Sequence, residues 1–271
     1  MPGDPDPLYV KARKVLLDAF DALEDHREAL VLVGAQAVYV HTGDTDLAVA
    51  EFTTDADLSI SPSDLANNPH IEDLLSNAGF RPGINPGSWL SADGVLVDLM
   101  VPETLAGTGS RSADLRPHGK PSARRAVGLE GSLIDRDKRE LASLDPSDKR
   151  AQTIWVAGPA ALIIAKAYKI HERITLPNRL IDKDALDLYR LLRATETRDV
   201  ADRLMVLRDS SLAGDVASRA IAFLPELFGS VDARGTRMAV RAAGDLERTD
   251  IIASSLVALV SDLLAEVHED S

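Results

Sequence analysis

Two aspartates one residue apart, Asp55 and Asp57, lie in a run over residues 51–60 that the sequence predicts to form a strand. Alternate side chains of a strand point to the same face of a sheet, so the two carboxylates should lie close together. Like charges this close repel each other unless a cation lies between them or one carboxylate is protonated. Carboxylate oxygens suit Mg²⁺, which also takes phosphate oxygens as ligands. The pair predicts a magnesium site; the alternative is a solvated strand edge.

Asp98 supports the magnesium prediction because it interrupts an apolar run over residues 94–101. An unpaired charge among apolar side chains is costly, and a partner cation explains it better than solvent does. If the two runs are neighbouring strands, Asp55, Asp57 and Asp98 can hold two Mg²⁺ ions. One ion would bind a nucleoside triphosphate, and the other would activate an attacking hydroxyl. Asp98 is then expected to help place or deprotonate that hydroxyl.

The amino-acid composition excludes some classes of protein and supports others. The 271 residues are enough for one large domain or two modest ones, and an apolar fraction of 45% supports a packed core. The formal net charge of -13 argues against broad nucleic-acid binding but allows a local basic patch. The absence of cysteine excludes disulfides and thiolate zinc sites. Because we find no signal-peptide pattern and no run of about 18 apolar residues, we expect a cytoplasmic protein without a membrane span.

The hydrophobic pattern predicts an α+β fold, with a mixed α/β half followed by a helical half. In the first half we predict helices over residues 8–23 and 69–77, and a short helix over 38–41. Strands are predicted over 29–33, 51–60, 89–90, 94–101, 129–134 and 153–156, with a hairpin joining 89–90 to 94–101. Helices over 160–173 and 182–193 open the second half, with Pro159 in the first turn. The predicted domains are residues 1–152 and 153–271.

A run of small residues, Gly34-Ala35-Gln36-Ala37, is expected to form the turn between the first strand and the helix after it. Small residues at a helix N-terminus let a phosphate approach the backbone N–H groups. They also serve ordinary close packing of a helix on a sheet, so the motif is weak by itself. Its position upstream of the acids makes Gly34, Ala35 and Thr54 candidate nucleotide contacts.

A third group of candidates lies in the helical half. Lys166, Lys169 and Arg173 share a helix face, and Asp184 and Asp187 share a face of the next helix. A lysine delivered to a triphosphate stabilises charge that develops on the phosphoryl oxygens. We expect Asp184 to orient Lys166 through an ion pair or to act as a base. The alternative is a set of ordinary ion pairs between helices.

One loop concentrates positive charge in this acidic chain, and we expect it to lead into an edge strand. Its basic residues are Arg111, Arg116, Lys120, Arg124 and Arg125. Such a cluster can contact RNA phosphates. A solvated loop whose charges are balanced by neighbouring acids explains it equally well.

The order of these motifs resembles that of the AbiEii-type nucleotidyltransferases, a family that includes toxins of bacterial toxin–antitoxin and phage-defence systems. The resemblance runs from about Ala29 to about Leu192, through TTDADL, VDLMVP, PAALIIAKAYKIHER and DKDALDLYRLL. It implies a polymerase-beta-like minimal nucleotidyltransferase domain followed by a helical domain. It also implies Mg²⁺-dependent transfer from an NTP, with the 3′ end of tRNA among the acceptors, and an antitoxin protein as a possible partner.

The resemblance also assigns roles to residues. Asp55 and Asp57 would be metal ligands, Lys166 would meet the nucleotide phosphates, and Asp184 and Asp187 would be the acids of the downstream motif. Two departures concern the nucleotide pose: Ala35 stands where the family often has Gly or Ser, and residues 43–52 are long compared with compact relatives.

Two further hypotheses stay open from the sequence. The same fold could transfer AMP to a protein hydroxyl, which the net acidity mildly favours over an RNA acceptor. The chain could also be a non-catalytic module that binds a nucleotide or a protein. Retention of both Asp98 and Lys166 argues against the non-catalytic hypothesis.

Overall fold

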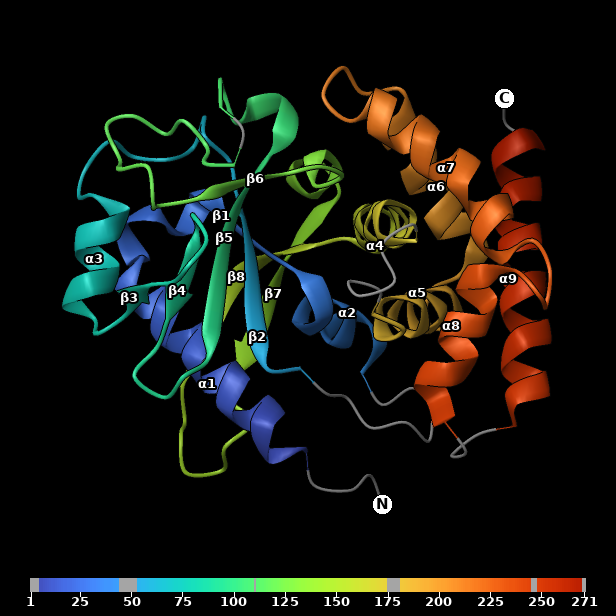
Figure 1. Cartoon of the computed structure of the whole chain (residues 1–271), viewed down its shortest axis with the longest axis horizontal. Helices are drawn as coiled ribbons and strands as arrows, with labels where there is room; N and C mark the ends of the chain where they lie inside the picture. Colours follow the sequence, from blue (N-terminus) through green and yellow to red (C-terminus); the bar gives the residue numbers. More distant parts are fainter. Residues whose placement is uncertain (1–4, 44–52, 110, 175–180, 245–247, 270–271) are drawn as a thin grey trace. The chain divides into compact units, whose positions relative to one another are not determined.

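The computed structural model describes residues 5–43, 53–109, 111–174, 181–244 and 248–269. The chain divides into two compact units, one made of Met1–Ala37 with Ala50–Ala157 and the other of Val38–Val49 with Gly158–Ser271. The first unit contains a mixed sheet with flanking helices, and the second is helical, so the fold is α+β. Figure 1 shows the sheet strands in blue to yellow-green and the helices of the second unit in yellow to red.

The sheet of the first unit has the order β3-β4-β5-β2-β1-β8-β7, and β6 pairs with β5 off this path. Parallel pairs join β1 to β8, β2 to β5 and β5 to β6, whereas the other pairs are antiparallel. The strands are β1 (Leu30–Val33), β2 (Asp55–Ile60), β3 (Arg81–Pro82), β4 (Ser88–Leu90), β5 (Leu96–Pro102), β6 (Arg124–Ala126), β7 (Arg136–Ala142) and β8 (Ala151–Ala157).

Helices pack on this sheet and on each other. Pro7 begins α1 (Pro7–Ala22), and the Asp6 side chain caps it by accepting a hydrogen bond of 2.8 Å from the Leu8 N–H. The apolar side of α1 contacts β2, β5 and α3 (Ile71–Asn77). The short 3₁₀ helices are η1 (Glu24–Ala29), η2 (Glu103–Leu105) and η3 (Glu130–Leu133). The helix after β1 is α2 (Gly34–Thr42), and the division between the two units falls inside it.

The second unit is built from helices around a shared apolar core. These are α4 (Pro159–Arg173), α5 (Lys183–Ala194), α6 (Thr197–Arg208), α7 (Gly214–Phe228), α8 (Arg234–Ala243) and α9 (Thr249–Glu269). The amphipathic α4 packs against α5 and α7, and α8 packs against α5, α7 and α9. In α6, α7 and α9 the buried apolar residues recur at helical spacing, so each of these helices turns one stripe to the core. By contrast, α5 is buried on all sides over most of its length.

One helix among the described residues is long and apolar enough to cross a membrane. Thr249–His268 has a mean hydropathy of 1.6, and 28% of that window is buried inside the protein. From the sequence we expected no run of about 18 apolar residues, and Ser and Asp residues do interrupt this one. Five buried residues, Ile252, Leu256, Val260, Leu263 and Val267, recur every three or four positions, and α9 contacts α6, α7 and α8. One face of α9 therefore packs within the helical unit.

Several predicted elements are confirmed and others are wrong. Helices α1, α4 and α5 and the β4–β5 hairpin occur where the sequence predicted them. The strand predicted over 129–134 is instead η3, where the buried Glu130 carboxylate accepts hydrogen bonds from the Gly128 and Thr104 N–H groups. The turn predicted over 34–37 belongs to α2 itself, because α2 begins at Gly34. Residues 51 and 52 of the predicted strand 51–60 lie outside the described residues.

Strand β7 was missed because its sequence, Arg-Asp-Lys-Arg-Glu-Leu-Ala, is polar. It lies at the edge of the described sheet, paired with β8, and its polar side chains can stay in solvent there. The predicted domain division after residue 152 also differs from the structure. Pairing with β1 and β7 keeps all of β8 in the first unit, up to Ala157.

Three histidines lie together beside the N-terminus of α3. The His118 ring is 5.4 Å from that of His26 and 5.7 Å from that of His70. Its Nδ1 accepts a hydrogen bond from the Ile71 N–H at 3.3 Å, and its Nε2 bonds the Ala66 carbonyl at 2.9 Å. These bonds require a neutral ring that is protonated only on Nε2. Burial and the nearby His26 and His70 lower the pKa of His118, against the opposing effects of the Ala66 bond and Glu72.

We expect acid to destabilise the first unit through His118. Its folded-state pKa lies below the ordinary value of 6.5, so the unfolded chain takes up the proton first and stability falls as pH drops below 6.5. Urea unfolding at a series of pH values should show a weaker dependence in His118→Gln than in wild type. His268→Gln, at the exposed end of α9, is the control. Equal pH dependence in all three proteins would contradict this role.

Candidate functional site

The pairing of β2 with β5 brings the three predicted metal ligands to one face of the sheet. In this parallel pair, Asp57 lies opposite Asp98, and Asp55 lies two residues earlier on the same strand. Directly opposed residues share a face, as do residues two apart on one strand. Alternate residues of β2, Ala56 and Leu58, are buried toward the other face. The carboxylates therefore occupy one end of adjacent strands.

The same end of the sheet meets the start of α2. Strand β1 runs antiparallel to β2 and places Val33 opposite Asp57, so the next residue, Gly34, lies against the Asp57 side chain. A Cβ added at Gly34 would lie 2.8 Å from Cβ and Cγ of Asp57, and closer still to Oδ2. Gly34 also has a φ of +70°, which favours glycine. A carboxylate at this position is favoured by the positive end of the α2 dipole.

A buried chain of hydrogen bonds fixes the start of β2. The Gln36 side chain, in the first turn of α2, donates to the Asp55 carbonyl at 3.0 Å and accepts from Arg13 Nε at 2.9 Å. Arg13 also donates to the Tyr9 hydroxyl at 2.7 Å. The Thr53 hydroxyl donates to Asp55 Oδ1 at 2.6 Å. These bonds tie α1, α2 and β2 together at the position where the acids begin.

Asp98 has a cationic partner. Arg124 of β6 donates from a terminal guanidinium nitrogen to Asp98 Oδ2 at 3.1 Å, and both side chains are partly exposed. The parallel pairing of β6 with β5 holds Arg124 beside the strand that carries Asp98. The sequence analysis attributed the charge of Asp98 to a metal ion; in the structure a guanidinium compensates it.

The donor chemistry of this face fits Mg²⁺, since the three side chains offer carboxylate oxygens. Asp55 and Asp57 have their carboxylates at the α2 end of the sheet, and Asp98, on the same face, pairs through Oδ2 with Arg124. Among the described residues, no group of three or more His, Asp or Glu side chains is arranged to hold a metal ion. Magnesium at Asp55, Asp57 and Asp98 therefore stays a prediction.

The predicted nucleotide contacts of this unit differ in exposure. The Ala35 side chain is buried, so only its backbone is available to a ligand. Thr54 is exposed in the bend before β2. Gly34 is occupied on its side-chain face by Asp57. A phosphate approaching this turn would therefore meet backbone and the Thr54 hydroxyl.

The second unit gathers the other candidates into a buried charged cluster. Lys166 Nζ lies 2.8 Å from Asp184 Oδ1 and 2.7 Å from Asp187 Oδ2. The exposed fractions are 4% for Lys166, 4% for Asp184 and 0% for Asp187. The expected ion pair between Lys166 and Asp184 is therefore present, and Asp187 completes it. Charges this deeply buried are tolerated because they are paired.

More cations than carboxylates converge on this cluster. Lys169 Nζ is 3.2 Å from Asp184 Oδ1, and Arg173 lies 3.8 Å from Asp184 Oδ2. Arg190 donates to Asp187 Oδ1 at 3.3 Å and lies against the Tyr39 ring and hydroxyl. Within the described part of the chain, four cationic side chains thus lie around these two carboxylates. Because Lys169 and Arg173 are partly exposed, the excess positive charge is suited to an anionic ligand such as a phosphate.

The ion pairs fix the protonation of the cluster. Burial alone would lower the pKa of Lys166, but Asp184 and Asp187 outweigh it and raise the pKa above its ordinary value. Burial alone would raise the pKa of Asp184, but Lys166 and Lys169 outweigh it and lower the pKa to about 2. Asp184 is therefore a weak base at neutral pH, which favours its orienting role over the alternative role as a base.

The basic loop is largely neutralised by its own neighbours. Arg116 pairs with Asp114, Arg124 with Asp98, and Arg125 with Glu103 at 3.6 Å. Arg111 and Lys120 remain exposed. Three of the five basic residues in the loop are therefore balanced by neighbouring acids, as the alternative interpretation of this loop predicted.

The sequence did not predict the roles of three residues that hold these two groups together. Gln36 lay within a recognised motif, but nothing local indicated that it bonds the Asp55 carbonyl 19 positions away. Arg124 was seen as part of a basic loop and not as the partner of Asp98. Arg190 follows Asp187 by three residues in a helix, a spacing from which the ion pair could have been predicted.

No model of a known protein family and no curated protein sequence matches this chain. A function for it therefore has to be inferred from its own residues.

Gly34→Ala should destabilise the first unit more than an ordinary positive-φ glycine substitution does. Gly79→Ala is the matched control, because Gly79 has a φ of +87° with nothing within 4 Å of an added Cβ. The control should cost about 1–2 kcal/mol from backbone strain, and Gly34→Ala should cost more because the Asp57 side chain must move. Urea unfolding measures both. Equal losses would mean that Asp57 does not pack against Gly34.

Asp187→Ala should strongly destabilise the helical unit. The substitution removes one of the two carboxylates that pair with the buried Lys166 ammonium, and it breaks the buried ion pair between Asp187 and Arg190. Breaking buried ion pairs typically costs about 3–5 kcal/mol. Asp199→Ala is the control, since it removes an exposed i,i+4 pair with Arg203 and should cost less than about 1 kcal/mol. Thermal and urea unfolding compare them, and similar losses would argue against a stabilising role for the network.

Proposed function

We propose that this chain is a nucleotidyltransferase that moves a nucleotide from an NTP to the 3′ end of a tRNA. The observation that carries the proposal is the register that sets Asp57 opposite Asp98, with Asp55 on the same face and Gly34 at the start of α2 beside them. Paired acids next to a helix that begins with small residues are suited to metal-dependent transfer to a hydroxyl.

Each candidate residue on this face of the sheet has a proposed role in the reaction. Asp55 and Asp57 would hold Mg²⁺, which supplies charge neutralisation of the triphosphate and activation of a hydroxyl when bound. The backbone at Gly34 and Ala35 and the Thr54 hydroxyl are the proposed contacts of the phosphates. Asp98 is proposed to position the acceptor hydroxyl after its carboxylate leaves Arg124. Alignment of the two reactants supplies much of the rate.

The finer fold assignment belongs to the same proposal. The mixed sheet, the small residues at the start of α2 and the acids on β2 and β5 support a polymerase-beta-like nucleotidyltransferase domain, in keeping with the AbiEii-type resemblance. With that family the proposal includes a role as a cytoplasmic toxin with an antitoxin protein as its partner.

The helical unit supports the proposal separately. Its excess of cations around Asp184 is the kind of environment that attracts phosphates, through the partly exposed Lys169 and Arg173. The contact of Lys166 with nucleotide phosphates stays a prediction. Since Lys166 is buried between two carboxylates, we assign it first to holding this cluster in shape.

Asp57→Asn should abolish transfer and leave the protein folded. Wild type and variant would be incubated with Mg²⁺, α-labelled NTPs, total tRNA and bacterial protein extract, and the label followed in each fraction. Loss of a metal-holding carboxylate should reduce transfer on the order of 100-fold or more. Asp93→Asn, in the exposed turn between β4 and β5, is the matched control for charge and should keep full activity. Circular dichroism checks that both variants fold.

The same experiment tests the alternatives. Label that follows protein instead of tRNA would replace the RNA acceptor by a protein hydroxyl. Equal transfer by wild type and Asp57→Asn would refute the assignment of the site. Transfer by neither protein, together with no Mg²⁺-dependent NTP binding in calorimetry, would indicate a non-catalytic module.

A further inference from the structure

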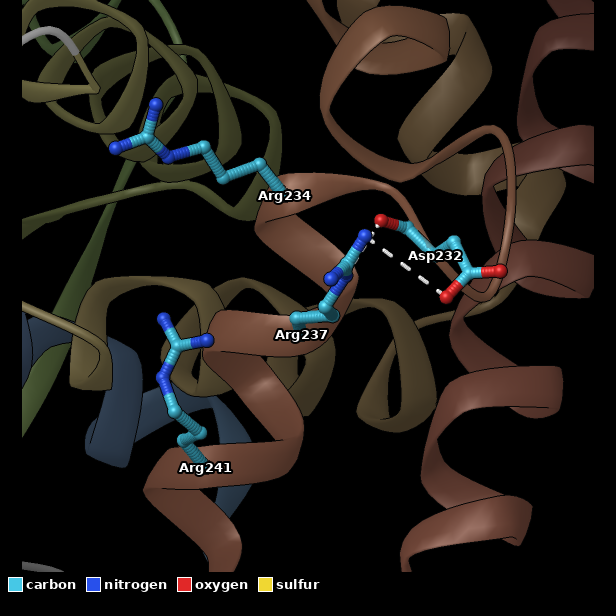
Figure 2. A pocket seen from close by; sticks show the side chains of 4 residues that line it. All are labelled: Asp232, Arg234, Arg237 and Arg241. Carbon is cyan, nitrogen blue, oxygen red and sulfur yellow. Dashed lines mark hydrogen bonds and ion pairs between the residues drawn. The ribbon is translucent and has the colours of Figure 1, made fainter.

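Helix α8 carries three arginines on one side. Arg234, Arg237 and Arg241 are spaced by three and four residues, so they lie along a single face of the helix. Figure 2 shows them on successive turns, with the side chain of Arg237 reaching Asp232. The four side chains line a hollow of about 380 Å³. We call the three arginines the arginine row.

The rest of α8 is anchored in the helical unit. Gly235, Thr236, Met238, Ala239 and Ala243 are buried on its inner side. A Cβ added at Gly235 would lie 2.7 Å from the Leu227 carbonyl oxygen, so α8 approaches the end of α7 closely. The arginine row therefore projects from a fixed helix, which keeps its members at set spacings.

The charges of the row are only partly compensated. Arg241 donates two hydrogen bonds of 2.8 Å to the Asp182 carboxylate, and Arg237 donates to the Asp232 carbonyl at 2.7 Å. Arg234 has no hydrogen bond or ion pair with any residue in the described part of the chain. All three arginines are exposed. Exposed ion pairs contribute little, so an incoming anion can replace the carboxylates at small cost.

The lining of the hollow indicates the class of ligand. Pockets for small molecules are mostly apolar, whereas this one is lined by three arginines and one aspartate. The row extends for about 10 Å along the helix axis, from seven residues at 1.5 Å each. Guanidinium groups bind phosphates through paired hydrogen bonds. A row of them matches a ligand that repeats its phosphates, which a nucleic-acid backbone does and a single nucleotide does not.

We propose that Arg234, Arg237 and Arg241 bind the phosphate backbone of the RNA acceptor. The inference rests on the proposed function, which requires that a chain with a net charge of -13 hold RNA. Repulsion by the other acids makes a local cationic row necessary. Asp182 and Asp232 occupy the arginines when no RNA is bound. The basic loop has a similar share of paired charges; the arginine row differs from it in lying at set spacings on one helix.

The test measures binding of fluorescently labelled tRNA to the full chain, without NTP, by anisotropy over a series of salt concentrations. The test variant carries Arg234→Gln, Arg237→Gln and Arg241→Gln. The matched control carries Arg198→Gln, Arg219→Gln and Arg248→Gln, which removes the same charge from exposed positions on α6, on α7 and before α9. Asp182→Asn, which frees Arg241, is the complementary variant; the Asp182 side chain makes no capping hydrogen bond to α5.

The row variant should bind tRNA at least about tenfold more weakly than the control, and its slope of log affinity against log salt should be shallower by about 2 to 3. Asp182→Asn should bind roughly two- to fivefold more tightly than wild type. Equal binding by the row variant and the control would overturn the proposal. Binding of fluorescently labelled poly-glutamate is measured in the same way. If the row variant loses poly-glutamate binding but binds tRNA as the control does, the proposal is also overturned, and the row is assigned to an acidic protein.

Failure of this inference is distinguishable from failure of the proposed function. If wild type labels tRNA and the row variant binds it normally, only the arginine row is wrongly assigned. If the row variant loses tRNA binding but wild type transfers no nucleotide, the row stands as an RNA-binding surface and the transfer activity is wrong.

Discussion

The parallel pairing of β2 with β5 is the constraint on which the chemistry of the first unit depends. A shift of one residue in this register would turn Asp57 away from Asp98 and bury a carboxylate among apolar side chains. The antiparallel β1 then sets Gly34 against Asp57, and only glycine leaves room there. An acidic face beside the start of α2 thus results from the strand order, from the register of β2 with β5 and from the absence of a side chain at Gly34.

Like charges gathered in this way have to be compensated, and the two units do so differently. In the first unit, Arg124 compensates Asp98 in a partly exposed pair that a ligand can displace at small cost. In the second unit, Lys166 is enclosed by Asp184 and Asp187 in a buried cluster that is costly to open. The first arrangement is suited to exchange of partners during a reaction. The second is suited to holding helices in a fixed relation while its exposed cations meet an anion.

The distribution of charge bears on the proposal that an acidic chain holds an RNA acceptor. A net charge of -13 repels nucleic acid over most of the surface, so binding has to be confined to a few cationic positions. In the basic loop, acids within it and beside it pair with three of the five basic residues. On α8 the spacing of three and four residues collects charge that is inconspicuous in the sequence.

The sequence by itself determined the elements that have a clear period and the residue types that can carry chemistry. The amphipathic stretches predicted α1, α4 and α5. Asp55 and Asp57 were recognised because a strand holds two like charges close together, and Asp98 because charge is costly in an apolar strand. Tertiary structure decided which groups meet. Contacts such as Arg124 with Asp98 and Gln36 with the Asp55 carbonyl join positions far apart in the chain, and no local pattern encodes them. Edge strand β7 and the helical turn η3 escaped prediction for the same reason: strand pairing and buried hydrogen bonds outweighed local preference.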